Sequence, residues 1–495
     1  MDGTEIELKL ACEPAVLARL RRHPAVAVLV EGPVRSRTLV SQYFDTADLA
    51  LAAAGLSLRI RRKGRQRIQT LKTEGSRSAG LFTRREWESP ATGERPGTDF
   101  LAASNLPELA APDLSARLQP VFSTKVRRTT LMLAGEDWRA ELALDEGEIV
   151  AGDARRPIAE AELELLAGPP ARLHDLARRL AEDLPLHLLT RSKSDRGYAL
   201  AAGRGPQPVK ARPPTLSEEM TAAQAFQAIG RACLAHLLAN QEALLAGDGE
   251  AVHQMRVALR RLRSAVRLFA KVVDGPATAK ALDDIRWLLR HLGPARDADV
   301  FVTEMLAPVV EAHPGDRAMA ALDSHWRRRR DADMAAARDA VASMRFTALV
   351  LDLGAWIEAG RWNVAKAATR AVVPFAAKVL ARRHRKIMKA GDGRLARLPP
   401  DELHQVRILG KQLRYGCEFF AGLLPGKAAR PFIAGLAELQ DALGRINDIA
   451  TALARLEAGP KSARPAADRA AAWHGDRRPG LVEEADKAWK RWRRL

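Results

Sequence analysis

The stretch Glu5-Ile6-Glu7-Leu8-Lys9-Leu10 determines how the first part of this sequence is interpreted. Because successive side chains of a β-strand point to opposite faces, its two glutamates and its lysine share one face, and its apolar residues share the other. Such a charged face is ordinary where it is solvated. It is also favourable where a divalent cation lies on the carboxylates and an anion such as phosphate lies on the lysine. The rest of the chain decides between these interpretations.

Charged strand faces recur through the first 203 residues. The same alternation places on common faces Arg59 with Arg61, Thr70 with Lys72, Arg84 with Glu86 and Glu88, Glu141 with Ala143 and Asp145, and Glu160 with Glu162 and Glu164. Strands whose matched faces are all charged do not build a sandwich with an apolar core. They fit a closed barrel or tunnel with a wet, charged lumen and an apolar outer face covered by helices. We therefore expect an N-terminal tunnel domain over residues 1–203.

The composition points to a polyanionic partner. The 495 residues carry 79 Lys and Arg against 60 Asp and Glu, a net charge of +19. Nucleic acid, an anionic membrane surface and inorganic phosphate chains are the partners that such a charge favours. The three cysteines are far apart, the N-terminus lacks the pattern of a secretory signal, and charges interrupt every apolar run. We expect a cytoplasmic protein with reduced cysteines and no membrane span.

The pattern changes after residue 203. Residues 204–216 are rich in proline and glycine, which indicates a semi-rigid linker. Residues 217–495 show helical periodicity and no strand pattern, so the fold class is α+β with an all-α C-terminal domain. Within that domain His253-Gln254-Met255-Arg256-Val257 recurs 151 positions later as His404-Gln405-Val406-Arg407-Ile408. We expect two homologous helical repeats, about 217–345 and 346–495.

Both repeated segments carry a stripe of basic side chains at helical spacing. The first stripe contains His253, Arg256, Arg260, Arg263 and Arg267, and the second contains His404, Arg407, Lys411 and Arg414. Like charges one turn apart repel one another unless an anion neutralises them. His236 and His384 precede the stripes, and no cysteine or carboxylate accompanies them at metal-ligand spacing. We therefore expect phosphate contacts along both stripes. Nucleic acid is disfavoured, because no aromatic residues are interleaved for base stacking.

Taken together, these residues resemble the CYTH–CHAD proteins of the triphosphate tunnel metalloenzyme superfamily. Glu5-Ile6-Glu7-Leu8-Lys9 is similar to the family's Glu-x-Glu-x-Lys signature. The later motifs follow in the family's order: Tyr43-Phe44-Asp45-Thr46, Leu58-Arg59-Ile60-Arg61, Thr70-Leu71-Lys72, Asp145-Glu146-Gly147, Glu160-Ala161-Glu162-Leu163-Glu164 and Ser192-Lys193-Ser194. The His-Gln-x-Arg segments and the end from Trp489 to Trp492 resemble a CHAD domain.

The resemblance implies an eight-stranded antiparallel tunnel that hydrolyses inorganic triphosphate to pyrophosphate and phosphate with Mg²⁺ or Mn²⁺. It also implies a CHAD half that binds inorganic polyphosphate, including granules, on its basic surface. Carried over position by position, it implies phosphate binding by Lys9, Arg59, Arg61, Lys72, Arg84, Arg128 and Lys193. It implies metal binding by Glu5, Glu7, Asp145, Glu162 and Glu164, and catalytic roles for Glu5, Glu7 and Lys9. Whether Glu160 also binds metal stays open, because the triplet of Glu160, Glu162 and Glu164 does not fix which of its members form the pair.

Three functions remain compatible with the sequence. The first is the metal-dependent triphosphatase, in which either a second metal or a lumen carboxylate activates the attacking water. The second is a binding protein whose tunnel only holds a phosphate chain while its helical half associates with polyphosphate granules. The third is a tunnel enzyme acting on an organic triphosphate such as thiamine triphosphate or a nucleotide, which needs a pocket beside the tunnel for the organic part.

Overall fold

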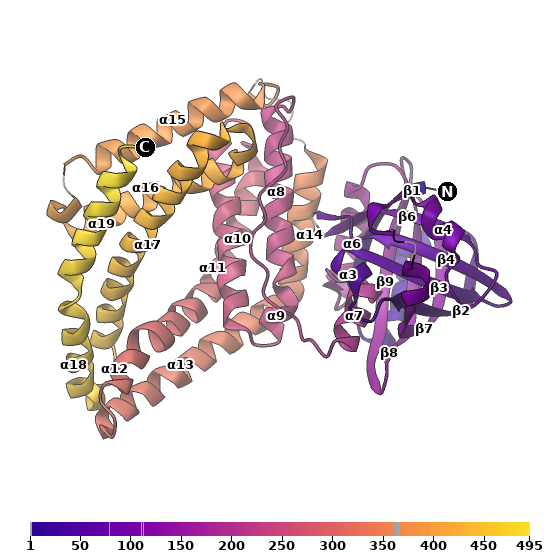
Figure 1. The fold of residues 1–495 in the computed structure, drawn as a ribbon, viewed down its shortest axis with the longest axis horizontal. Helices are drawn as coiled ribbons and strands as arrows, with labels where there is room; N and C mark the ends of the chain where they lie inside the picture. Colours follow the sequence, from indigo (N-terminus) through magenta and orange to yellow (C-terminus); the bar gives the residue numbers. More distant parts are fainter. Residues whose placement is uncertain are drawn as a thin grey trace. The chain divides into compact units, whose positions relative to one another are not determined.

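The computed structural model describes residues 2–78, 80–109, 111, 113–360, 362, 367–393 and 395–495 (Figure 1). The chain forms two compact units. We call Met1–Gln207 with Ala342–Ala359 the tunnel unit, and Pro208–Val341 with Gly360–Leu495 the helical unit. The expected linker is thus shared between the units, and a helix from within the expected helical domain belongs to the tunnel unit.

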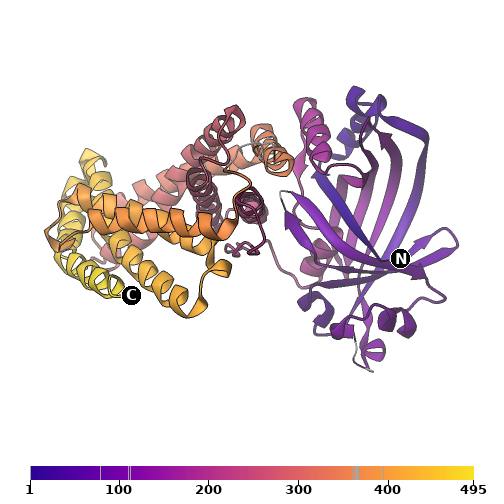
Figure 2. The ribbon, with the colours of Figure 1, turned by 90° about the horizontal axis from the view of Figure 1, so that it is seen from above.

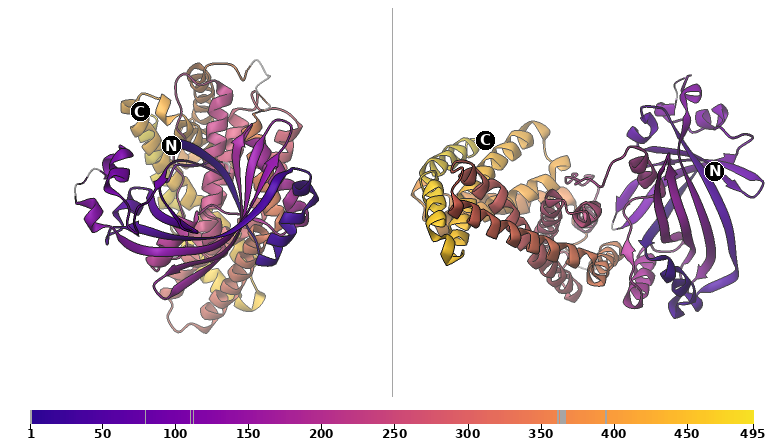
Figure 3. Two further views of the ribbon diagram at one scale, coloured as in Figure 1. Left: turned by 90° about the vertical axis from the view of Figure 1, so that its right-hand side faces the viewer. Right: turned by 90° about the horizontal axis from the view of Figure 1, so that it is seen from below.

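The tunnel unit is a closed antiparallel barrel. Its eight main strands are β1 (Asp2–Ala11), β2 (Val30–Asp45), β3 (Leu56–Lys63), β4 (Gln66–Thr73), β6 (Leu81–Pro90), β7 (Gln119–Ala134), β8 (Arg139–Ala151) and β9 (Ala154–Ala167). They lie in the order β1-β9-β8-β7-β2-β3-β4-β6, and β6 pairs back onto β1. The short strands β5 (Ser76–Ser78) and β10 (His187–Leu188) extend the sheet. Figures 2 and 3 show the long strands curving around a common interior. The expected eight-stranded antiparallel tunnel is confirmed.

Strand register places the charged faces inside the barrel. Lys9 on β1 lies opposite Glu162 on β9, and Glu5 on β1 lies opposite Arg84 on β6. Cross-strand neighbours of opposite charge on one face stabilise a sheet. The intervening side chains of Leu8 and Leu10 have no exposed surface, so the apolar face of β1 points outward into a covered core.

Helices cover the apolar outer face of the barrel. Those of the tunnel unit are α1 (Pro14–Arg22), α2 (Pro24–Ala27), α3 (Ala50–Ala53), α4 (Thr98–Ala103), α5 (Leu114–Arg117), α6 (Ala171–Asp183), α7 (Lys193–Ala201) and α14 (Met344–Ala359). Helix α14 packs along α6. The Thr347 hydroxyl donates a 2.8 Å hydrogen bond to the Leu186 carbonyl, and Arg178 Nε lies 3.1 Å from Asp352 Oδ1. A segment distant in sequence therefore completes the cover of the barrel.

An apolar plug fills one end of the barrel interior. Phe122, Val126 and Arg128 alternate on the inner face of β7, so the first two lie in the same interior as the charged lumen. The ring of Phe122 stacks on Tyr43 with centroids 4.3 Å apart and meets the edge of Tyr198 on α7 at 5.0 Å. A Cβ atom at Gly197 would lie 2.0 Å from the Phe122 ring, so only glycine lets α7 approach this closely.

The helical unit contains the expected repeat. Its first half holds α8 (Ala222–Ala239), α9 (Gln241–Leu245), α10 (Gly249–Leu268), α11 (Pro276–Val300), α12 (Ala307–Glu311) and α13 (Arg317–Ala342), and its second holds α15 (Val372–Ala390), α16 (Pro400–Phe419), α17 (Gly426–Glu457), α18 (Arg464–Gly475) and α19 (Arg478–Trp492). Helices α8, α10 and α11 begin 150, 151 and 150 positions before α15, α16 and α17. The repeat that the sequence predicts is therefore a repeat of three long helices, with the short α9 inserted between the first two in the first half. Among the described residues no single helix is long and apolar enough to cross a membrane, and only the bent pair Arg317–Ala342 and Met344–Ala359 passes that test together.

Candidate active site in the tunnel lumen and a basic surface on the helical unit

The lumen holds a cavity of about 230 Å³ that gathers charged residues of six strands and the start of α7. Among the lining residues are Glu5, Glu7, Lys9, Arg59, Arg61, Lys72, Arg84, Arg128, Glu162, Glu164 and Lys193. Asp145 and Glu160 are fully buried beside it. All of the predicted phosphate and metal residues of the tunnel are thus brought together in one interior.

Three carboxylates form the deepest acidic cluster, Asp145, Glu160 and Glu162, whose ligand atoms all lie within 4.8 Å of one another. Lys193 Nζ lies 2.7 Å from Asp145 Oδ2 and 3.0 Å from Glu162 Oε1, and it also contacts Glu160. Arg128 Nε donates a 2.8 Å hydrogen bond to Asp145 Oδ1. Burial opposes ionisation of Asp145 and Glu162, but the cations at Lys193 and Arg128 outweigh it and hold the pKa of both carboxyls below its ordinary value.

The position of Lys193 follows from a local sequence signal. Ser192 caps α7: its hydroxyl accepts a hydrogen bond from the Asp195 backbone, and the Asp195 carboxylate accepts one from the Ser192 backbone at 2.8 Å. This reciprocal capping box fixes the first turn of the helix and so directs Lys193 into the barrel. Arg196, one turn later, contacts Glu160. Sequence reasoning missed Arg196, although its spacing of three from Lys193 places both on one helix face.

A second acidic group lies on β1. Lys72 Nζ is 2.8 Å and Arg84 Nε 2.9 Å from Glu5 Oε2, while Lys9 Nζ is 2.6 Å from Glu7 Oε2. Lys9 also contacts Glu162, so it links the two acidic groups. Burial raises the pKa of Glu5, but Lys72 and Arg84 reverse this and bring it far below its ordinary value. Both β1 carboxylates therefore form ion pairs with neighbouring cations.

Glu164 differs from the other carboxylates. Within the part of the chain that the structure describes, its side chain forms no ion pair or hydrogen bond. Burial and the neighbouring carboxylates of Glu5 and Glu141 raise its pKa to about 7. An uncompensated carboxyl facing other carboxylates is the arrangement that a hard divalent cation, which prefers oxygen ligands, stabilises. The lumen thus fits a metal through Asp145, Glu160 and Glu162, with Glu164 nearby. The predicted ligands Glu5 and Glu7 are engaged by lysine and arginine, as the three carboxylates of the cluster also are.

Two arginines on β3 line the lumen, and they differ in their partners. Burial, Arg59 and Arg128 lower the pKa of Arg61 to about 10. Its Nε donates to Ser41 Oγ at 3.3 Å, and no carboxylate of the described residues pairs with it. The buried Nε of Arg59 lacks a hydrogen-bond partner among those residues, whereas its Nη1 donates to the Tyr43 hydroxyl at 3.5 Å and its Nη2 lies 3.9 Å from Glu86 Oε1. Such an array is favourable when an anion lies between the guanidinium groups.

Helices α10 and α16 of the helical unit pack together and form a basic cluster. Burial, Arg260 and Arg407 lower the pKa of Lys411 to about 7. The Nε atoms of Arg260 and Arg407 are buried and lack a hydrogen-bond partner in the described part of the chain. Burial and Arg296 lower the pKa of His253 to about 4. Cations are thus crowded where the two predicted stripes meet, beside the carboxyl group of Asp448.

The remaining basic candidates lie in different surroundings. Arg267 is exposed, and the pKa of Arg263 is lowered by burial and by Arg267. Arg256 donates to the Gly293 carbonyl and to Asp297 Oδ1, both at 2.7 Å. Arg414 Nε lies 3.1 Å from Glu418 Oε1. These last two arginines already have anionic partners.

Three of the predicted histidines, His236, His384 and His404, have partners other than the arginines and lysine of the basic cluster. His236 is buried and hydrogen-bonds through Nε2 to the Val209 carbonyl and Gln254 Oε1, at 3.0 and 3.1 Å. The His384 ring packs against Trp492, with centroids 5.8 Å apart. His404 Nδ1 lies 3.0 Å from Asn447 Oδ1. In the structure His236 therefore anchors the end of the linker to α8, and His384 packs against the C-terminal aromatic residues.

A closed antiparallel barrel with carboxylates and cations interleaved in its lumen, joined to a pseudo-symmetric basic helical unit, defines a two-domain protein built to receive anions. Comparison with protein families gives the same division. The CYTH domain matches residues 3–198 and the CHAD domain matches residues 228–457, so the chain belongs to the CYTH–CHAD proteins.

Individual relatives agree with this assignment. An inorganic triphosphatase of Haemophilus influenzae is 33% identical over 198 residues, which cover 40% of this chain and 55% of that protein. The chain thus spans about half the length of this relative. An uncharacterised protein of Mycobacterium tuberculosis is 27% identical over 438 residues, 83% of this chain and 81% of its own. The crystal structure of the CHAD domain of Ricinus communis is 31% identical, covers 57% of this chain and 96% of that one, and superposes with a TM-score of 0.50.

Proposed function

We propose that the tunnel hydrolyses inorganic triphosphate to pyrophosphate and phosphate with Mg²⁺ or Mn²⁺, and that the helical unit binds inorganic polyphosphate. One observation carries the first half: Arg61, which has no paired carboxylate among the described residues, and Arg59 line a cavity beside a carboxylate cluster suited to a divalent cation. A phosphate chain would add negative charge beside these arginines, and its metal ion would add positive charge at the carboxylates. The inorganic triphosphatase among the relatives of the CYTH half supports the choice of reaction.

The chain's own residues account for binding and orientation. Arg59, Arg61 and Arg128 neutralise phosphate oxygens, and the ion pairs around Lys9 and Lys72 keep those lysines extended into the cavity. A divalent cation held by Asp145, Glu160 and Glu162 would neutralise further phosphate charge and polarise the phosphoryl group. We assign proton acceptance from the attacking water to a carboxylate oxygen of Glu164, because a pKa near 7 suits a general base at neutral pH.

Replacement of Glu164 tests the enzyme against a passive binding protein. We expect Glu164→Gln to lower phosphate release from tripolyphosphate by about 10²- to 10⁴-fold, the usual contribution of a general base. Glu148→Gln is the matched control, since Glu148 lies on the neighbouring strand outside the lumen and pairs with Arg155. Phosphate release is measured with Mg²⁺ and with Mn²⁺. The absence of turnover by the unmodified protein with either metal would refute the proposed activity, and equal rates for Glu164→Gln and the control would refute the assignment of the base.

The same residue predicts a pH dependence of stability without added metal. The folded-state pKa of Glu164, about 7, lies above the ordinary carboxyl value of 4.5, so the folded state holds the proton more tightly. Its contribution to stability is complete below about pH 4.5 and is lost as the pH rises through 7. Glu164→Gln should therefore be more stable than the unmodified protein at pH 8 and differ little at pH 4.5. Urea unfolding at both values measures this, and a constant difference would contradict it.

The basic cluster supports the second half of the proposal. A polyphosphate chain bound there would favour the charged form of Lys411, whose pKa is near 7 in the free protein. We expect binding near pH 8 to take up a proton and to weaken as the pH rises above 7. Calorimetry in buffers of different ionisation enthalpy measures the proton uptake. Lys411→Arg, which stays charged, should abolish the uptake and retain binding, and uptake unchanged in this variant would contradict the assignment.

Compartment and location follow from the proposed partner. We place the protein in the cytoplasm in association with polyphosphate, including granules. Cys12, Cys233 and Cys417 are all free, which supports a reducing compartment.

A further inference from the structure

A second cavity adjoins the lumen at the end of the barrel remote from α7. Its volume is about 700 Å³, and it shares Arg61, Glu88 and Arg128 with the lumen cavity. We call it the vestibule. It is lined further by Arg35, Arg37, Lys63, Arg139, Glu31, Glu141 and several aliphatic side chains. Because the plug of Phe122, Tyr43 and Tyr198 fills the other end, the vestibule is the open approach to the lumen.

The inner faces of β2 and β3 remain basic beyond the predicted motifs. Arg35 and Arg37 lie on the same face of β2 as Tyr43, and Lys63 continues the row of Arg59 and Arg61 on β3. None of these three additional cations was identified from sequence. The same alternation could have found them, since it runs unbroken from residue 57 to 63 on β3 and from 35 to 43 on β2.

The vestibule cations lack compensation. Arg37 pairs in register with Arg128 across β2 and β7, and like charges directly opposite each other destabilise a sheet. Within the described ranges, Arg35, Arg37 and Lys63 form no ion pair or hydrogen bond. Arg139 is balanced by Glu31, at 3.7 Å. Six cations and three carboxylates line the vestibule, which leaves an excess of positive charge. The excess favours an anion that extends beyond the lumen.

The lining identifies the class of anion. No aromatic side chain is present among the described residues of the vestibule, so nothing offers a stacking surface for a nucleobase or a thiamine ring. The rows of cations continue from the vestibule into the lumen, and such rows favour a linear anion with repeating charges. The plug at the far end allows such a chain to enter only by its end.

We infer that the vestibule binds the fourth and following phosphates of a linear inorganic polyphosphate whose terminal phosphates occupy the lumen. This rests on the proposed triphosphatase function and extends its substrates to chains of four or more phosphates, cut at the end. In each turnover one water adds across one phosphoanhydride bond. The water oxygen bonds to phosphorus, the bridging P–O bond breaks, and the bridging oxygen leaves on the other fragment while one proton is released.

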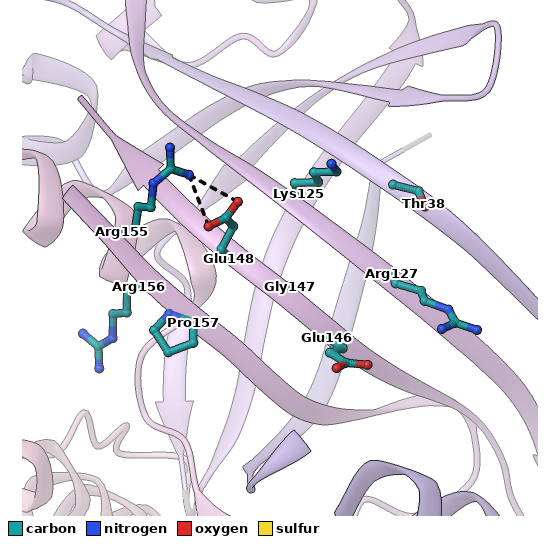
Figure 4. A pocket seen from close by; sticks show the side chains of 9 residues that line it. All are labelled: Thr38, Lys125, Arg127, Glu146, Gly147, Glu148, Arg155, Arg156 and Pro157. Carbon is teal, nitrogen blue, oxygen red and sulfur yellow. Dashed lines mark hydrogen bonds and ion pairs between the residues drawn. The ribbon is translucent and has the colours of Figure 1, made fainter. Parts of the chain in front are cut away.

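The test uses two double variants of equal charge change in the full-length chain. Arg37→Gln with Lys63→Gln removes two vestibule cations. Lys125→Gln with Arg127→Gln is the control, because these side chains lie on the outer face of β7, where a separate shallow pocket adjoins Glu146 and Glu148 (Figure 4). Tri-, tetra- and longer polyphosphates of defined length, ATP and thiamine triphosphate are compared as substrates.

We expect the vestibule variant to lower kcat/KM for chains of four or more phosphates by about 10- to 100-fold, and to change that for tripolyphosphate by less than about threefold. The control should follow the unmodified protein with every substrate. The double variant Arg260→Gln with Lys411→Gln measures how far polyphosphate binding to the helical unit affects these rates, because it leaves the tunnel residues unchanged.

The outcomes separate this inference from the function on which it rests. If the unmodified protein releases no phosphate from tripolyphosphate, the proposed function fails. If it hydrolyses tripolyphosphate but the vestibule variant loses activity on all chain lengths equally, or on none, the vestibule assignment alone is overturned. A preference for ATP or thiamine triphosphate over inorganic tetraphosphate would also overturn it.

Discussion

Replacing Arg61 with glutamine is expected to lower kcat/KM for tripolyphosphate by about 10²- to 10³-fold, the usual loss when one aligned donor to a charged transition state is removed. The same variant should be as stable as the unmodified protein, or more stable. Burial, Arg59 and Arg128 already lower the pKa of Arg61 to about 10, so its charge is less favourable in the free tunnel than in water and is stabilised when an anion is present. Loss of activity without loss of stability would be the mark of a binding residue.

Arg62→Gln is the control for this experiment. Arg62 is the next residue on β3, is exposed, and points away from the lumen. Steady-state kinetics and urea unfolding are measured for both variants with and without tripolyphosphate. Addition of tripolyphosphate should stabilise Arg62→Gln more than Arg61→Gln. Equal kinetics for the two variants, or a marked loss of stability in Arg61→Gln alone, would contradict the role given to Arg61.

Replacing Lys193 with methionine should have the largest effect on stability. The variant leaves Asp145, Glu160 and Glu162 crowded without the ammonium group that contacts all three. Removing one partner of a buried ionic network usually costs about 3–5 kcal/mol. We expect the free energy of unfolding of the tunnel unit at pH 8 to fall by this amount. Unfolding in urea is monitored by amide hydrogen exchange in β8 and β9. Lys193→Arg, which keeps the charge, should lose much less.

The pH dependence distinguishes this electrostatic cause from a simple packing defect. In the unmodified protein the pKa values of Asp145 and Glu162 are lowered, so their contribution to stability is present above their unfolded values and is lost as the pH falls. Without Lys193 the crowded carboxyls should bind protons more readily in the folded state, and lowering the pH should stabilise the variant. The difference from the unmodified protein should shrink towards pH 4. A difference that does not change with pH would contradict this explanation.

The sequence predicted the barrel because its signal is local and periodic. Glu7 and Lys9 must share a strand face whatever the topology, and so must Arg59 and Arg61, since the pleat has a period of two. When every such face in a domain is charged, the shared interior must be a charged lumen. The helical repeat was equally accessible, because a constant offset between His253 and His404 can be read without knowing how the helices pack.

Only the tertiary structure decided which charged side chains contact one another. Glu5 and Glu7 share a strand face, but cross-strand register placed Lys72 and Arg84 beside Glu5, and left Glu164 without an ion-pair partner among the described residues. The capping of α7 brought Lys193 into the acidic cluster. Helix α14, within the segment read as the helical domain, packs instead on α6. The sequence by itself therefore determined which side chains share a face, because that depends on neighbours along the chain. Only the folded structure determined the charge balance of the opening stretch and its lumen, because that depends on residues far apart along the chain.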